Sequence, residues 1–305
     1  MTGRQYMIAE GVDDEDIETP MGDDLPPELL KFSGVKLGGK GGGNSKIDHP
    51  SFSLPAGHTC NNAKDCKSCA DRETGALTDS PNAKFRCFAA SQENYLTNVR
   101  KMRWHNYDLL KRTKNVTEMA DLIDRSFQNA FTDKLGQLII PPVMRLHVGG
   151  DFYDQTYFVA WIEMARRYPQ MIIYAYTKAL VFWKKHRDIM SSNFVLTASR
   201  GGTHDYLIDT EKFKSSEVVF SHANAEAKGL PIDHDDSHAA FGDENFATLI
   251  HGQQAPKSDA SKARSALRKD VGYTGYNTNR KGKVSEGKTY LLTEYQALWL
   301  LGEIE

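Results

Sequence analysis

The sequence lacks any long apolar run, and no stretch reaches the ~18–20 uninterrupted apolar residues of a membrane-spanning helix. Its first residues, Met1 to Tyr6, also lack the apolar core of a secretion signal. A formal charge of −2 excludes a uniformly basic binder. The 305 residues are 40% hydrophobic and 26% charged, which is typical of a globular chain. We therefore expect a soluble, cytoplasmic protein that binds no membrane.

Cysteine is scarce, and all four cysteines lie within one short stretch, with the spacing Cys60-x5-Cys66-x2-Cys69-x17-Cys87. Two thiolates spaced as in C-x2-C can bind one metal centre. A reducing cytosol disfavours the alternative of disulfide bonds. We therefore predict that Cys60, Cys66, Cys69 and Cys87 are metal ligands. Three closely placed sulfurs suit an iron–sulfur cluster at least as well as zinc, and the spacing alone leaves both open.

The composition changes along the chain and predicts three regions. Residues 10–28 carry nine acids and no base, which favours a solvated arm. Residues 38–46 are glycine-rich and lack the order of a phosphate-binding loop, so a flexible linker is favoured. We therefore expect a flexible N-terminal extension over residues 1–50, a cluster-binding domain over 51–255, and a C-terminal helical extension, packed on that domain, over 256–305.

Short apolar strands alternate with helices in the centre of the chain. Strands are predicted at 144–148, 171–176, 194–198, 217–221 and 246–251, and helices at 89–113, 116–131, 154–168 and 180–191. This alternation indicates βαβ units with a parallel sheet. The predicted fold class is α/β, a partial or full (β/α) barrel preceded by a loop-rich region over residues 51–91 that bears the cysteines.

Polar residues follow these strands, at the ends where parallel α/β folds collect their chemistry. Two glycines after a strand also allow a ligand to approach the backbone closely. Capping of the next helix explains Asp151 or Ser199 equally well. The predicted catalytic residues are Asp151, Tyr176, Lys178, Ser199 and Arg200, and the predicted cofactor-binding residues are Gly149, Gly150, Asp151, Thr177 and Lys178.

Two further segments have alternative interpretations. Residues 84–114 carry eight bases against two acids, with aromatic residues between them, so this segment is a candidate for binding nucleic acid. The alternative is a solvated helix face. The run His234-Asp235-Asp236-Ser237-His238 contains possible metal ligands, but a polar loop is favoured.

The order of these motifs resembles the radical S-adenosylmethionine superfamily. In that superfamily, three cysteines on a loop bind a [4Fe–4S] cluster, and a Gly-Gly-Glu motif after the next strand contacts S-adenosylmethionine at the fourth iron. The resemblance implies cluster binding by Cys60, Cys66 and Cys69, and cosubstrate binding by 149–151. Here the first spacing is x5 rather than the usual x3, and the acid is Asp151. If Cys87 also binds the cluster, no iron is left open to S-adenosylmethionine.

The chain is also similar to the bacteriophage proteins named after gene product 88 of mycobacteriophages, over most of residues 44–275. The matching stretches are 52–60, 85–91, 149–153, 174–178 and 251–254. The resemblance implies a phage protein that works in the host cytoplasm.

Taken together, these patterns predict a phage-encoded iron–sulfur protein with a [4Fe–4S] cluster and S-adenosylmethionine as cosubstrate. As a radical-type enzyme it would modify a nucleic acid or a nucleotide. One alternative is a non-catalytic nucleic-acid-binding protein whose four cysteines hold a structural zinc. Another is an interaction protein that acts through the acidic arm.

Overall fold

A computed structural model describes residues 28–34 and 49–273 of the chain. The predicted acidic arm except Glu28, the glycine-rich linker and the end of the C-terminal extension lie outside these residues. Within them, Leu30 is buried and Phe32 packs against the main core, so residues 28–34 belong to the folded domain. No helix of the described part is long and apolar enough to cross a membrane.

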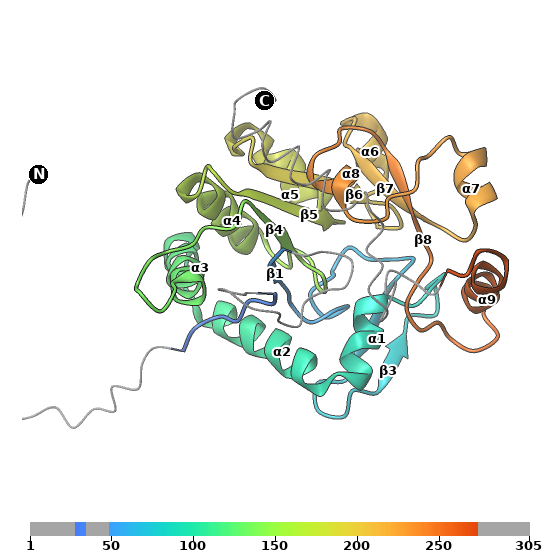
Figure 1. Cartoon of the computed structure of the whole chain (residues 1–305), viewed down its shortest axis with the longest axis horizontal. Helices are drawn as coiled ribbons and strands as arrows, with labels where there is room; N and C mark the ends of the chain where they lie inside the picture. The colour runs from blue at the N-terminus through green and yellow to red at the C-terminus, as the bar shows by residue number, and fades with distance from the viewer. Residues whose placement is uncertain (1–27, 35–48, 274–305) are drawn as a thin grey trace, which may run out of the picture.

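Six parallel strands form the main sheet (Figure 1). In sheet order they are β1 (Ser51–Phe52), β4 (Val143–Leu146), β5 (Ile172–Thr177), β6 (Phe194–Ser199), β7 (Ser215–Val219) and β8 (Phe246–Leu249). Each strand pairs in parallel with the next one along this order. The predicted α/β class is confirmed. Among the described residues, β1 and β8 are the two edges of the sheet and do not pair with each other. The sheet is therefore not a closed barrel, but a partial barrel is allowed.

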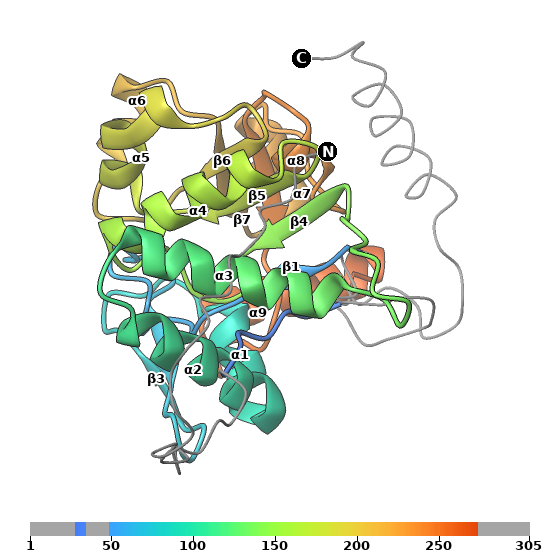
Figure 2. The same cartoon turned by 90° about the vertical axis from the view of Figure 1, so that its left-hand side faces the viewer.

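Alternation along the strands separates two faces of this sheet. Leu146 and Ile173 point to the larger core, which they share with Trp161 and Phe127 of helices α4 (Gln155–Arg167) and α3 (Val116–Phe131). Figure 2 shows these two helices side by side across that face. At the amino ends of the strands, the other face is covered by the short helix α8 (Ser237–Ala240), which contacts β5 and β6. A cavity remains on this second face, at the carboxyl ends of the strands.

Shorter elements complete the connections. They are α5 (Leu180–His186), the 3₁₀ helix η1 (Arg187–Ile189), α6 (Tyr206–Thr210), α7 (His222–Ala227) and α9 (Asp259–Val271). Helix α9 lies within the predicted C-terminal extension. The strand predicted at 217–221 starts two residues earlier, and the one predicted at 144–148 ends at Leu146, so His147 already belongs to the loop.

The helix predicted over 89–113 is two helices, α1 (Phe88–Tyr95) and α2 (Thr97–Arg112), so that prediction was wrong. Leu96 lies between them with φ −107° and ψ 83°, outside the helical region. The buried guanidinium of Arg100 donates to the carbonyl oxygens of Glu93 and Asn94, which the break leaves without helical partners. Hydrophobic periodicity does not report such a break, because it reads side-chain spacing and not backbone capping.

The region that carries the cysteines consists largely of turns, as predicted, with one small hairpin of β2 (Ser68–Ala70) and β3 (Leu77–Asp79). The backbone N–H groups of Lys64 and Asp65 donate to Gly201 O, at 3.0 and 2.9 Å. Leu54 N donates to Gly149 O at 2.9 Å. These bonds fasten the cysteine-bearing region across the carboxyl ends of the sheet.

Candidate functional site

The cavity at the carboxyl ends of the strands has a volume of ≈ 400 Å³. It brings together residues that are far apart in the sequence, because the cysteine-bearing region covers the strand ends that line the rest of it. Of the predicted site residues, those that line it are Cys60, Cys66, Cys87, Gly149, Gly150, Asp151, Tyr176, Thr177, Lys178 and Ser199. Cys69 and Arg200 are not part of its lining.

Three thiols share this cavity and influence one another. Burial raises the pKa of Cys60 well above its usual value, and the charges of Asp151, Cys87 and Cys66 raise it further. Burial also raises the pKa of Cys87, to about 11, and Cys66 is its strongest charged neighbour. In the metal-free protein these two thiols are therefore neutral at pH 7. A bound cation would favour their thiolate forms.

Cys69 has different surroundings, because it lies in β2. Its Sγ is 3.9 Å from Thr78 O, and the charges that act on it are those of Lys67, Glu93 and Asp79. The structure thus groups Cys60 and Cys66 with Cys87 rather than with Cys69. No group of three or more His, Cys, Asp or Glu side chains within residues 28–34 and 49–273 is arranged to hold a metal ion. Metal ligation stays a prediction.

Asp151 joins the ends of β4 and β5. Its Oδ1 accepts from Thr177 Oγ1 at 2.6 Å and from Phe152 N at 2.8 Å, and its Oδ2 accepts from Lys178 N at 2.8 Å. Burial raises the pKa of this carboxyl, while these hydrogen bonds oppose the shift. Asp151 therefore holds neighbouring parts of the cavity wall in place.

The other predicted strand-end residues divide into two groups. Lys178 Nζ donates to Ser199 Oγ at 2.5 Å and to Ser199 O at 3.0 Å, and both residues line the cavity. Tyr176 faces the cavity and donates its hydroxyl to Asp236 Oδ1 at 2.9 Å. Arg200 instead forms a partly exposed ion pair with Asp209 at 2.9 Å.

The two glycines after β4 allow the protein itself to pack closely. A Cβ on Gly149 would lie 2.5 Å from the guanidinium of Arg103. Gly150 has φ +89°, and a Cβ there would lie 2.7 Å from both Leu54 Cβ and Thr59 Oγ1. We expected a ligand to approach the backbone at these glycines. On their Cβ side, Arg103 and the cysteine-bearing region occupy that space instead.

The sequence interpretation missed a buried ion pair at the floor of the cavity. Arg145 Nη1 lies 2.5 Å from Asp236 Oδ2, and the hydroxyl of Tyr174 donates to the same oxygen at 2.9 Å. Asp236 comes from the segment 234–238, where a polar loop was favoured, and it has the unusual φ of +69°. An arginine in an otherwise apolar strand was the available signal, because a buried cation needs a partner.

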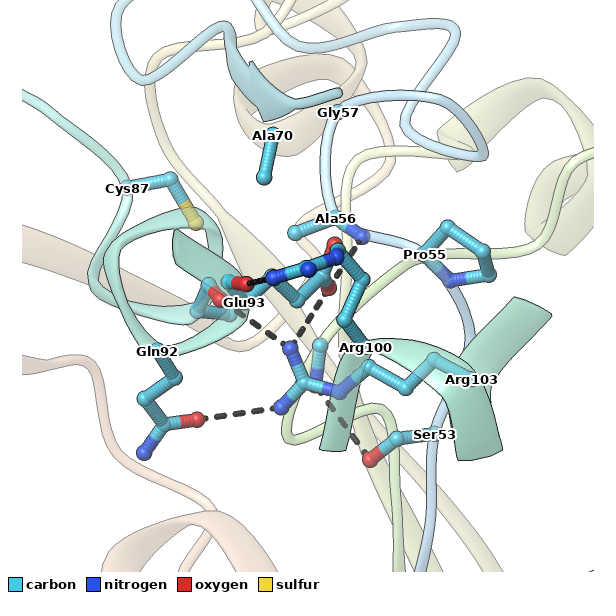
Figure 3. Close-up of polar contacts among 12 residues, drawn as sticks. Ser53, Pro55, Ala56, Gly57, Ala70, Cys87, Gln92, Glu93, Arg100 and Arg103 are labelled. Carbon is cyan, nitrogen blue, oxygen red and sulfur yellow. Dashed lines mark hydrogen bonds and ion pairs between the residues drawn. The ribbon is translucent and has the colours of Figure 1, made fainter. Parts of the chain in front are cut away.

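A second buried ion pair fixes the cysteine-bearing region to α1 (Figure 3). Glu93 Oε1 accepts from Ala56 N at 2.8 Å and from Arg103 Nη1 at 2.6 Å. Arg103 also donates to Gln92 Oε1 at 3.0 Å. Because Ala56 precedes Cys60 and Glu93 follows Cys87 on α1, this pair helps to fix two of the three thiols relative to each other.

The basic segment 84–114 is less available to a polyanion than its composition indicates. Arg100 and Arg103 are buried, Arg86 pairs with Asp79, and Lys84 pairs with Asp65. Arg112 also pairs with Glu28, and the ammonium of Lys111 lies over the ring of Tyr153, so internal contacts occupy six of its eight bases. Binding of nucleic acid through this segment stays a prediction.

The fold and the cavity define an α/β protein with an open parallel sheet whose carboxyl ends are covered by a cysteine-bearing region. The chain belongs to the Gene product 88 family, whose profile matches residues 29–269 and so includes every residue of the site. The predicted bacteriophage family is thereby confirmed. The resemblance to radical S-adenosylmethionine enzymes stays a prediction.

Two relatives come from mycobacteriophages. The chain is 26% identical over 164 residues to the Gene 88 protein of Mycobacterium phage D29, and 27% identical over 167 residues to that of Mycobacterium phage L5. Each alignment covers 54% of this chain and 62% of the relative, which is less than two thirds of the relative's length. No solved structure matches the chain.

Proposed function

We propose that this phage protein is an iron–sulfur enzyme of the host cytoplasm, with a cluster held by Cys60, Cys66 and Cys87. The observation that carries the proposal is that these three thiols line the same cavity as the polar strand ends. Cysteine thiolates are the usual ligands of such clusters. With three cysteine ligands, a [4Fe–4S] cluster keeps one iron open to the cavity, and an open coordination position is what allows a metal centre to act on a substrate.

The chain's own residues fit a cosubstrate beside that position. Lys178 has an ammonium group at the cavity wall, held by Ser199, which suits a carboxylate such as that of S-adenosylmethionine. Asp151 fixes the backbone of Lys178, and Thr177 is held by the same carboxylate. When bound, the cluster would supply the electron that cleaves a carbon–sulfur bond of S-adenosylmethionine, leaving methionine and a carbon radical. The substrate we propose is a nucleotide or nucleic acid.

The test is anaerobic purification and reconstitution with iron and sulfide, followed by metal analysis and visible absorption. We expect a brown protein with about four irons per chain. Cys87→Ala should lose the cluster, whereas the matched control Cys69→Ala should keep it, because Cys69 lies outside the cavity.

A colourless protein with one zinc, lost equally in both variants, would overturn this proposal. That result would favour the alternative of a structural zinc held by all four cysteines.

A further inference from the structure

The part of the cavity formed by β7 and β8 carries hydroxyl groups that the protein does not use. Ser216 and Thr248 line the cavity and are only 5% and 9% exposed. Val218 pairs in register with Thr248, so Ser216 and Thr248 lie on the same face of adjacent strands. Neither hydroxyl has a hydrogen-bond partner among the residues that the structure describes. Both hydroxyls are thus available to donate to, or accept from, a ligand in the cavity.

Across the floor, Arg145 has donors to spare. Its Nη1 binds Asp236, while its buried Nε has no hydrogen-bond partner. A guanidinium carries five N–H donors in a fixed plane. The ring of Tyr176 lies 5.0 Å from Arg145 Cζ, and the hydroxyl of Tyr176 binds Asp236. The guanidinium is therefore held in one orientation before any ligand enters.

The charges that line the cavity favour an anion. The two acids of the lining, Asp151 and Asp236, are both engaged in the hydrogen bonds described above. Lys178 contacts Ser199 rather than an acid, and Arg264 of α9 forms no ion pair with any residue of the described part. The charge of Lys178 acts on Asp151 and Arg145 pairs with Asp236, so Arg264 remains to balance the charge of a ligand.

We infer that this part of the cavity binds a phosphate group of the substrate, through Arg145, Ser216 and Thr248, with Arg264 contributing charge. Guanidinium and hydroxyl donors from separate elements suit the several terminal oxygens of a phosphate. The inference names the substrate class for the cavity of the proposed enzyme, but it needs no cluster. It can therefore succeed or fail independently of the proposed metal site.

The test is calorimetric titration of the full chain with ribose 5-phosphate and with ribose, before and after cluster reconstitution. We expect ribose 5-phosphate to bind and ribose to bind at least about tenfold more weakly. Thr248→Val and Ser216→Ala should each weaken binding of ribose 5-phosphate about tenfold. Both changes remove only a hydroxyl without a partner, so the fold should persist.

The matched control is Thr197→Val. Thr197 lies on neighbouring β6 and its buried hydroxyl also lacks a partner, but it does not line the cavity, so affinity should be unchanged. On α9, Arg264→Ala should weaken binding, whereas Arg268→Ala, one turn further along, exposed and outside the cavity lining, should not.

Three results would overturn the inference. They are equal affinity for ribose and ribose 5-phosphate, equal affinity for glucuronate, which offers a carboxylate instead, and Thr248→Val behaving like Thr197→Val. A colourless preparation that still binds ribose 5-phosphate would leave the inference standing and count only against the cluster.

Discussion

The two walls of the cavity differ in how far the protein itself occupies their polar groups. On the wall of β4, β5 and β6, Asp151 and Lys178 are engaged with neighbouring backbone and side chains. On the wall of β7, β8 and α9, the side chains of Ser216, Thr248 and Arg264 form no hydrogen bond or ion pair within the described residues. The first wall thus consists largely of groups that build the site, and the second of groups that remain for a ligand.

The strongest test of this difference removes the acid beneath the floor. Asp236→Ala leaves the Arg145 guanidinium buried without its counter-ion, and we expect a loss of about 3–5 kcal/mol in the free energy of unfolding. Urea denaturation followed by circular dichroism measures it. The control Asp188→Ala, at an exposed position of η1, should cost less than about 0.5 kcal/mol. Similar losses for both would show that the pair does not stabilise the floor.

Acid should weaken the first wall through His147. Burial lowers the pKa of this histidine to about 3, against an ordinary value of 6.5, and its Nε2 lies 2.9 Å from the hydroxyl of Tyr157. Between these two pH values the unfolded chain binds more protons, so stability falls as pH falls through this range. From pH 7 to 4.5 we expect His147 to account for a loss of about 2–3 kcal/mol.

The variant His147→Asn isolates this contribution. Asparagine tolerates the positive φ of +62° at this position and does not titrate. Urea denaturation at both pH values should show a smaller acid loss for the variant than for the wild-type chain. Equal losses would mean that His147 is protonated in the folded protein.

Asp151→Ala should have a smaller effect. It leaves Lys178 N and Thr177 Oγ1 without their acceptor, which should cost about 1–3 kcal/mol in the free energy of unfolding. The comparison variant is Asp154→Ala, which removes only the N-cap of α4 and should cost about 1 kcal/mol. Thermal and urea denaturation of both variants would measure the difference. If Asp151→Ala were as stable as the wild-type chain, Asp151 would not stabilise the first wall.

The smallest effect is expected at Arg200. Its ion pair with Asp209 is partly exposed and lies outside the cavity, so Arg200→Ala should change the free energy of unfolding by about 0–1 kcal/mol. Binding of ribose 5-phosphate should not change. A marked loss of affinity would place Arg200 back in the site where the sequence interpretation put it.

Patterns that repeat along the chain predicted most of the fold. The helix expected at 116–131 matches α3, because apolar periodicity and the cap at Asn115, whose side chain accepts from Glu118 N at 2.9 Å, agree. The strand β1 was missed because two residues carry no detectable alternation. The break at Leu96 was missed because the contacts that compensate it, from the guanidinium of Arg100, are made to backbone carbonyls.

The site was predictable only as a location. The cavity lies at the carboxyl ends of the parallel strands, and most residues expected there line it. Partners that lie across the fold are not encoded in local spacing. Asp236 is 91 residues from Arg145, and Cys87 joins Cys60 and Cys66 although Cys69 is nearer in sequence.

The cysteine-bearing region and the wall of β7, β8 and α9 also differ in when a ribosome produces them. Cys60, Cys66 and Cys87 have all been translated before β4 exists, whereas Arg264 follows Cys87 by roughly 180 residues, or about 10–35 s at common elongation rates. A nascent chain therefore carries its thiols for many seconds before the last wall encloses them. Any metal delivered during synthesis would meet these thiols while the way to them is still open.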